Sequence, residues 1–461
     1  MKSKNLGILS AGPALAIVGI VLATAGVSDD GSRVAVPVIA AIGVLVTGAL
    51  TRFQPDRATG TYLLNLMLLG VAVRLFLFTG IHQTVGPYVF APDQWTYESR
   101  GMGLLSFWRG IGPFPSRIGE NLQVGYPTIN AVVFYLFGFA KSAPAILNIF
   151  CSVWAAIPVY HLAMLLVRRN EGVARLAAGL TVFFPSLILW SVLNIREAPT
   201  ILVLAASIHF AVRLQHHPSF GSLAGLVVGL SVLTVFREYL TLLLGTAIVA
   251  GIFIGRSGSP FRALVAGSVL LFTLAFAAQA LGLGGTLAGE PSLDQVQAVR
   301  QGFLYDANSA YGRGADLTTP AGALAFLPIG LAYFLLAPFP WAIGSTLQAI
   351  TLPETLLWYA ILPMGIWGAV LAIRHDIRMF TVPLASLILI TLAYALVEAN
   401  VGTAYRHRAQ ILPVIFVFCA VGIRDVLALR AARLQRVAES RSRMANVSAA
   451  GQPRRGGTSS H

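Results

Sequence analysis

The segment 82–125, which follows an apolar stretch of the chain, includes Asp93 and Glu98 among its acidic residues. Asp93 and Glu98 are five residues apart, so a helix would place them on roughly opposite sides and not as a pair of carboxylates. One carboxylate at the mouth of a membrane cavity can still act as a general base on a hydroxyl group. We therefore take both as candidate catalytic residues, against the alternative that they are solvated loop acids. Further candidates nearby are Arg74, Tyr97 and Arg100.

Arginines recur at the ends of later apolar stretches, in the motifs Asn194-Ile-Arg196-Glu197, Phe236-Arg237-Glu238-Tyr239 and Tyr405-Arg406-His407-Arg408. Arginine suits phosphate because its planar guanidinium group donates two parallel hydrogen bonds. An arginine cluster on the outer face of a membrane runs against the usual charge bias, which favours a functional role. The alternative is that neighbouring Arg and Glu residues form local ion pairs. The candidate ligands for a lipid phosphate are Arg196, Arg237, Arg406, His407 and Arg408.

The last of these motifs lies in a short connection between the apolar stretches 380–397 and 411–429. If this connection is extended, Arg406 and Arg408 point to one side and His407 points to the other. We therefore predict that Arg406 and Arg408 hold the phosphate, and that His407 is either a third ligand or structural.

The composition decides what kind of protein must position these residues. Of the 461 residues, 56% are hydrophobic and 11% are charged, against about 25% charged in an ordinary globular protein. The mean hydropathy is +0.75. A soluble fold, a disordered chain and a secreted disulfide scaffold are excluded. The fold class is an all-α polytopic integral membrane protein.

A membrane-spanning helix needs about 20 mostly apolar residues, and the chain has about 11 to 13 such stretches. Two further stretches, 126–140 and 321–339, are ambiguous, and the orientation below requires that they do not each cross the membrane once. The clearer stretches are 8–27, 34–50, 62–81, 145–167, 176–193, 199–214, 223–236, 240–254, 263–283, 356–373, 380–397 and 411–429.

The charge distribution orients these stretches. The net charge is +14, and the segment 424–461 holds eight Arg against Asp425 and Glu439. A basic tail directly after an apolar stretch is the usual sign of a cytoplasmic end, so we do not expect nucleic acid as a partner. The long loops 82–125 and 284–320 then face outward. Three regions are expected: two extra N-terminal spans in 1–59, a catalytic membrane module in 60–429, and a basic, disordered tail in 430–461.

Neither cysteine has the spacing of a metal ligand. Cys151 and Cys419 lie within apolar runs, and the chain contains no Cys-x-x-Cys motif. No cluster of His and Asp has ligand spacing either. The sequence requires no cofactor, although it allows a divalent metal.

Several motifs are spread between about residues 74 and 422. They are the Asp93 loop, Gly125-Tyr126-Pro127, Leu136-Phe137-Gly138, the segment from Phe184-Pro185 to Ser191 ahead of Arg196-Glu197, Pro338-Phe339-Pro340-Trp341, and Arg406-His407-Arg408 followed by Pro413. Together they resemble the GT-C superfamily of polytopic glycosyltransferases, most of all its bacterial protein-mannosyltransferase-like and ArnT-like branch (family 39-type). This chain differs in having two spans before the Asp93 loop, and it has no clear second acid beside Asp93.

The resemblance implies an inverting transfer of a sugar from a polyprenyl-phosphate donor to an envelope glycan, lipid or protein. The residue that matches the family's first-loop acid is Asp93, which would orient or deprotonate the acceptor. The basic residues would stabilise the departing lipid phosphate. The implied location is the bacterial cytoplasmic membrane, with the active face outward and membrane lipid as a partner.

Two other functions stay open. An O-antigen-type polymerase or ligase would use arginines of the late outer loop, and a transporter would show internal repeats with matched interrupted helices. We find no similarity between the two halves of the chain. The residues of the late loop that a polymerase could use are Arg300, Tyr305, Asp306, Tyr311 and Arg313.

Overall fold

The computed structural model describes residues 11–115, 123–167, 169–254, 293–305, 307 and 309–450. Within these ranges every regular element is a helix, apart from one isolated antiparallel bridge between Ala310 and Asn400. Seven helices of the described residues are long and apolar enough to cross a membrane, and a bent pair, Glu171–Phe183 with Pro185–Ser191, is an eighth candidate. The protein is an all-α polytopic membrane protein, and the predicted fold class is confirmed at this level.

The helices follow one another with short connections, except around the residues outside the description. Their bounds are α2 Gly12–Gly26, α3 Asp30–Arg52, α4 Arg57–Gln83, the 3₁₀ turn η1 Pro87–Val89, α5 Gln94–Trp108, α7 Gly125–Phe137, α8 Ala143–Trp154, α9 Ala156–Leu166, α10 Glu171–Phe183, α11 Pro185–Ser191, α12 Glu197–His216, α13 Phe220–Ile254, α15 Leu293–Leu304, α16 Pro320–Leu336, α17 Thr346–Ile350, α18 Leu352–Val397, α19 Val401–Arg408 and α20 Leu412–Ala450.

Polar side chains start several of these helices. The carboxylate of Asp29 accepts a hydrogen bond from the backbone N–H of Ser32 at the start of α3, and Asp56 does the same for Thr59 at the start of α4. Such caps satisfy backbone donors that have no partner within the helix. Proline supports other starts, since its missing N–H is not needed in the first turn. Helices with proline at one of their first two positions include α2, α8, α11, α16 and α18.

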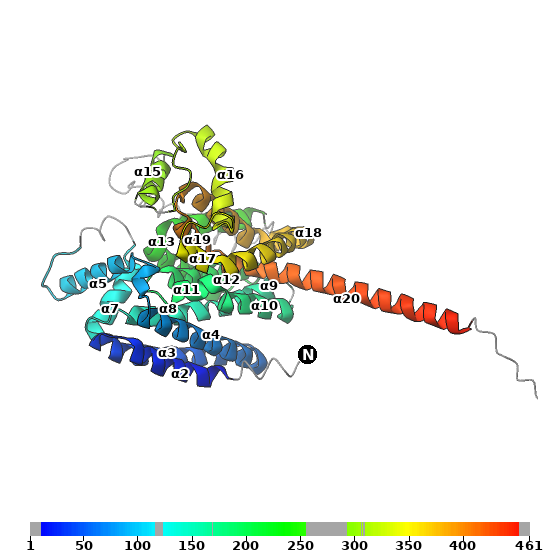
Figure 1. The fold of residues 1–461 in the computed structure, drawn as a ribbon, viewed down its shortest axis with the longest axis horizontal. Helices are drawn as coiled ribbons and strands as arrows, with labels where there is room; N and C mark the ends of the chain where they lie inside the picture. The colour runs from blue at the N-terminus through cyan, green and yellow to red at the C-terminus, as the bar shows by residue number, and fades with distance from the viewer. Residues whose placement is uncertain are drawn as a thin grey trace, which may run out of the picture.

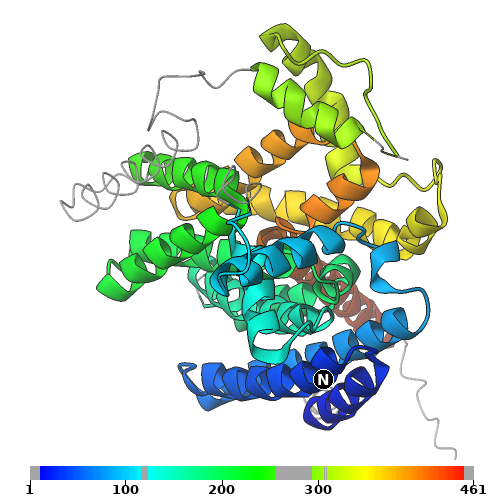
Figure 2. The same cartoon turned by 90° about the vertical axis from the view of Figure 1, so that its left-hand side faces the viewer.

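Two of the longest helices are broken. A straight helix as long as α18, with 46 residues, would measure about 70 Å, more than twice the roughly 30 Å of a bilayer core. The backbone of α18 leaves helical geometry at Asp376, and that of α13 does so at Arg237. The two green halves of α13 diverge from one point in Figure 2. Each broken helix therefore contains two of the apolar stretches that the sequence separates, with a charged residue at the join.

The helices form one connected bundle. Helices α2, α3 and α4 pack together at the lower edge of Figure 1, and α15 and α16 lie at the upper edge. In the middle, α18 packs against α13 and α20, and α12 packs against α9 and α13. A single buried apolar cluster runs through the bundle from α2 to α20. The far end of α20 projects away from the other helices, on the right of Figure 1.

Three expectations about individual segments have an outcome here. The ambiguous stretch 126–140 forms α7, whose 13 residues measure about 20 Å and are too few to span a membrane. The stretch 321–339 forms α16, a 17-residue apolar helix with Pro328 inside. The prediction that the chain is disordered from residue 430 is wrong as far as Ala450, because α20 continues through a run rich in Ala and Arg, which favour helix. Residues 451–461 and the predicted span 263–283 lie outside the described residues.

Candidate functional site

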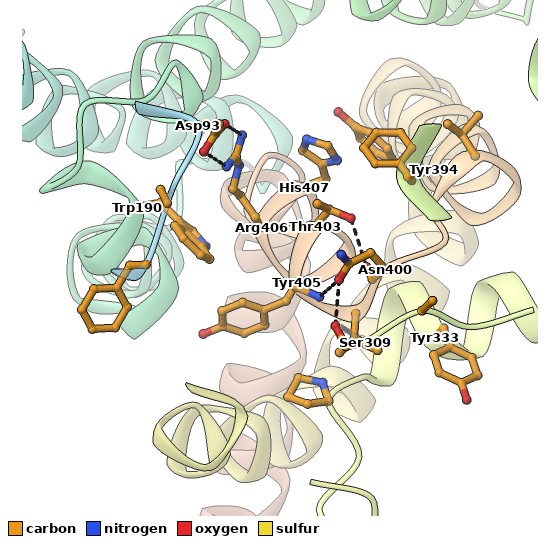
Figure 3. A pocket seen from close by; sticks show the side chains of 18 of the residues that line it. Asp93, Trp190, Ser309, Tyr333, Tyr394, Asn400, Thr403, Tyr405, Arg406 and His407 are labelled. Atoms are coloured by element: carbon orange, nitrogen blue, oxygen red, sulfur yellow. Dashed lines mark hydrogen bonds and ion pairs between the residues drawn. The ribbon is translucent and has the colours of Figure 1, made fainter. Parts of the chain in front are cut away.

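A cavity of about 1680 Å³ opens where the ends of several helices meet. Its walls come from the segment around η1 and α5, the start of α12, the break in α13, and from α15, α17, α18 and α19. One part of the lining is charged and another is apolar (Figure 3). The charged and polar lining residues discussed below are Asp93, Tyr97, Arg196, Arg237, Tyr239, Tyr394, Arg406 and His407.

Asp93 binds Arg406 across the cavity in a two-bonded ion pair. Nη1 of Arg406 donates to Oδ1 of Asp93 at 3.0 Å, and Nη2 donates to Oδ2 at 2.8 Å. Partial burial would raise the pKa of Asp93, but the charge of Arg406 and its hydrogen bonds outweigh burial and hold this pKa below the ordinary value. The candidate base is therefore an ionised carboxylate with both oxygens engaged.

Glu197 joins two arginines from distant parts of the chain. Its Oε1 accepts from Nη2 of Arg237 at 2.7 Å and from Nε of Arg406 at 2.9 Å. Glu197 stands in the first turn of α12, where a carboxylate also interacts favourably with the helix dipole. Arg237 reaches it because the break in α13 releases this residue from the helix. The sequence left open that neighbouring Arg and Glu residues form local ion pairs. This alternative is wrong for Glu197, whose partners lie 40 and 209 residues away along the chain.

His407 lies between Arg237 and Glu398. Its Nε2 accepts from Nη2 of Arg237 at 3.0 Å, so its Nδ1 carries the proton that it shares with the carboxylate of Glu398. Thr403 also donates to Glu398, at 2.6 Å. Burial raises the pKa of Glu398 to about 7, while burial and then the charge of Arg237 lower the pKa of His407. His407 is therefore a neutral ring that orients Arg237, and it does not add a positive charge to the cavity.

Arg196 is bound differently from the other two arginines of the cavity. Its Nη1 donates to the side-chain oxygen of Gln123 and to the backbone carbonyl of Phe236, which are neutral acceptors. Its Nε is buried, with no hydrogen-bond partner among the described residues. Because a buried donor without a partner costs free energy, Arg196 is suited to bind an anion that enters the cavity.

Arg408 does not line the cavity. The expectation of an extended connection is wrong, because residues 401–408 form α19, in which residues two apart point about 200° away from each other. The guanidinium group of Arg408 instead donates to the backbone carbonyls of Leu335 and Ala337, at 2.9 and 2.8 Å. Asn400 caps α19 by accepting from the N–H of Gly402, so the signal for this helix was present in the sequence.

Three more candidates lie away from the cavity lining. Arg74 is fully buried and donates to the hydroxyl groups of Ser152 and Ser191, both at 2.9 Å. Glu98 is buried and accepts from the hydroxyl group of Tyr88 at 2.7 Å, and burial raises the pKa of its carboxyl group. Arg100 is on α5 and is not among the lining residues. Tyr97 does line the cavity, with its ring edge-to-face against Tyr126.

The late outer segment is attached to the site by Arg300. This guanidinium group donates to the backbone carbonyls of Glu398, Tyr311 and Gly312, and it stands 4.1 Å from the ring centre of Phe326. The contacts fasten α15 to the connection between α18 and α19. Tyr305 lines the cavity and is 81% exposed, Arg313 is exposed, and Asp306 lies outside the described residues.

Sequence reasoning missed two tyrosines that support the arginines. Tyr239 accepts from Nη1 of Arg237, and its hydroxyl group lies 2.8 Å from that of Tyr394. Tyr394 in turn donates to Gln410 at 2.7 Å and stacks on the ring of His407. A tyrosine within an apolar helix carries no signal of such a role. The position of Tyr239, two residues after Arg237, was the one available hint.

No model of a known protein family matches the chain, and no curated protein sequence matches it. Among the described residues no three His, Cys, Asp or Glu side chains come together in a way that could hold a metal ion. The functional argument therefore depends on the chemistry of the cavity itself.

Proposed function

We propose that the protein is a membrane glycosyltransferase that moves a sugar from a polyprenyl-phosphate donor to an envelope acceptor. The observation that carries the proposal is the meeting, in one cavity at the ends of membrane helices, of the carboxylate of Asp93 with three guanidinium groups. A carboxylate can receive the proton of an acceptor hydroxyl group, and guanidinium groups can bind the phosphate that leaves. The three arginines are Arg196, Arg237 and Arg406.

The apolar lining supports a lipid-linked donor. Leu242 and Leu243 follow the break in α13, and Val296 and Val299 face the same cavity from α15. An isoprenoid chain needs such a surface beside the polar site that holds its phosphate group. A donor with both parts matches a cavity with both kinds of lining.

In the proposed reaction, an acceptor hydroxyl oxygen attacks the anomeric carbon of the sugar from the side opposite the phosphate. The new carbon–oxygen bond forms as the bond from that carbon to the phosphate oxygen breaks, so the configuration inverts. The acceptor proton passes to Asp93, and the bond electrons leave with the lipid phosphate. Arg196 and Arg406 stabilise the negative charge that grows on that phosphate.

The proposal includes the more detailed expectations from the sequence about architecture, location and substrate. The chain would have the GT-C architecture with about 11 to 13 spans. It would lie in the bacterial cytoplasmic membrane with the cavity facing outward. The donor would be a lipid-linked sugar, the acceptor would be an envelope glycan, lipid or protein, and a divalent metal would be an optional addition.

The test is turnover of a radiolabelled polyprenyl-phosphate sugar by the purified protein. Asp93→Asn should lower the transfer rate about 100- to 10,000-fold, which is the typical effect of losing a general base. Asp316→Asn is a matched control, because Asp316 is an exposed acid whose side chain binds only Thr318 among the described residues. Transfer by Asp93→Asn within a factor of a few of the unaltered protein would refute the assignment.

A further inference from the structure

Arg406 has two edges, and each edge binds a different carboxylate. The Nε edge binds Glu197, and the edge formed by Nη1 and Nη2 binds both oxygens of Asp93, as the paired dashed lines in Figure 3 show. A guanidinium group makes the same two-bonded contact with a carboxylate and with a phosphate. Asp93 therefore occupies the edge of Arg406 that a phosphate group would need.

The two ion pairs of this cluster differ in their access to the cavity. The side chains of Arg237 and Glu197 are 2% and 0% exposed, whereas those of Arg406 and Asp93 are 14% and 38% exposed. A buried pair is costly to separate because both charges would lose their partners without gaining water. The pair that an incoming anion can exchange is therefore Asp93–Arg406, while Glu197 keeps the Nε edge in place.

The backbone beside Asp93 is held without help from Arg406. The amide of the buried Gln94 donates to the carbonyls of Pro87 and Ala91, and its oxygen accepts from the N–H of Asn194. These bonds fasten the start of α5 to the connection before α12. Losing Arg406 as a partner would therefore free the Asp93 carboxylate without moving its backbone.

We propose that the Asp93–Arg406 pair is a closed state of the site, and that the donor phosphate opens it by taking the Nη edge of Arg406. The inference rests on the proposed function and adds a regulation of the same site. While Asp93 accepts two hydrogen bonds from Arg406, the guanidinium charge stabilises the ionised carboxylate and makes it a weaker base toward an acceptor hydroxyl group. Donor binding releases the base, so the acceptor is activated only after the donor has bound.

A closed state has a measurable cost for binding. The apparent affinity for a ligand falls by the fraction of protein that is competent to bind it, so removing a closed state that dominates tenfold tightens binding about tenfold. Removing the carboxylate of Asp93 should therefore strengthen the binding of a lipid phosphate, although it destroys the proposed base. If Asp93 only held Arg406 in position for the phosphate, removing its carboxylate would weaken the binding of a lipid phosphate.

The experiment measures the dissociation constant of a polyprenyl monophosphate without sugar, using the full-length protein in nanodiscs. We expect Asp93→Asn and Asp93→Ala each to tighten binding roughly 3- to 30-fold. The same Asp93→Asn change in an Arg406→Ala background should alter binding less than about twofold. Asp316→Asn controls for the loss of one negative charge, and the polyprenol and inorganic phosphate show which part of the probe is bound.

Each outcome decides a separate statement. Unchanged or weaker binding by both Asp93 variants, with normal binding by the unaltered protein, overturns the closed state and leaves the proposed function standing. If Asp93→Asn tightens binding equally in the Arg406→Ala background, the cause is the negative charge of Asp93 and not its pairing with Arg406. This outcome also overturns the closed state. If the unaltered protein binds the monophosphate no better than the polyprenol, the proposed function fails and the inference fails with it.

Discussion

Arg406 and Arg408 stand two residues apart on α19 and serve different surroundings. Arg406 binds Asp93 and Glu197 at the cavity, whereas Arg408 binds the carbonyls of Leu335 and Ala337 at the end of α16. The helix separates two residues that the sequence pattern groups together. One short element therefore supplies both a group for the substrate site and a group that holds the bundle around it.

The first prediction separates these two arginines. Arg406→Ala should weaken donor use roughly 10- to 150-fold, since a hydrogen bond to a charged group contributes about 1.5 to 3 kcal/mol. Arg406→Lys should recover only part of this, because lysine cannot make the two-bonded contact. The measurement is kcat and KM for the donor. Unchanged values for Arg406→Ala would move the phosphate site to Arg196 and Arg237.

Arg408→Ala serves as the counterpart in the same assay. It leaves two buried carbonyls without their donor, so we expect a loss of about 1 to 3 kcal/mol in the free energy of unfolding with the donor KM unchanged. Thermal unfolding of the solubilised protein measures the stability. A rise in donor KM without a fall in Tm would instead restore Arg408 to the substrate site.

A second prediction concerns Arg300, which an O-antigen-type polymerase would need for chemistry. All of its hydrogen bonds among the described residues go to backbone carbonyls, so Arg300→Ala should loosen α15 and lower Tm. Arg313→Ala, at an exposed position, is the matched control for the stability and proteolysis measurements. Limited proteolysis should cut the 293–315 segment faster in Arg300→Ala. If Arg300→Ala abolished transfer while the 293–315 segment resisted proteolysis as before, the result would favour the polymerase hypothesis.

The third prediction is a pH dependence of stability caused by Glu398. Burial raises the pKa of its carboxyl group from the ordinary 4.5 to about 7 in the folded protein. Between these values the folded protein keeps a proton that the unfolded chain has released, so the free energy of unfolding falls as the pH rises through this window. Above about pH 7 the contribution is lost and the dependence ends.

Tm measured from about pH 4.5 to about pH 8 checks this dependence. Glu398→Gln cannot ionise and should remove the Glu398 contribution, so the difference in Tm between the unaltered protein and this variant should change with pH within the window. Thr403→Val removes one hydrogen bond to the carboxylate and should move the upper end of the window to higher pH, since that bond stabilises the charged form. Parallel curves for the unaltered protein and Glu398→Gln would contradict the assignment.

The fourth prediction tests the orientation in the membrane. In a background without Cys151 and Cys419, a cysteine at Gly314 should react with a membrane-impermeant maleimide in intact spheroplasts. A cysteine at the exposed His217 should react only after lysis. Gly314 is preferable to Gly312, whose φ of +63° and close approach to Arg300 leave no room for a side chain. The reverse labelling pattern would invert the topology and put the cavity on the cytoplasmic side.

The sequence allowed the membrane class to be predicted, because apolar length and low charge are properties of composition. It also grouped Asp93 with Arg196, Arg237, Arg406 and His407, because the order of spans brings the same ends of alternate helices to one face. The breaks in α13 and α18 were visible as charged residues between two apolar runs.

The pairing within that group could not be predicted. Asp93 and Arg406 are 313 residues apart, and Arg300 and Glu398 are 98 residues apart, so neither contact leaves a local pattern. The separation of Arg406 from Arg408 depended on recognising Asn400 as a helix cap within a short connection. Tyr394 could not be singled out, because it lies in the apolar stretch 380–397, where a tyrosine gives no sign of its polar contacts.

The surroundings of Arg74 bear on how the chain is made. The hydroxyl groups that bind this guanidinium group come from Ser152 and Ser191, which follow it by 78 and 117 residues. During synthesis α4 leaves the ribosome before either serine exists, and a charge within a membrane helix is costly in contact with lipid. The full stabilisation of α4 must therefore wait for α8 and α11, so the first membrane helices complete their packing only after the chain has been made as far as Ser191.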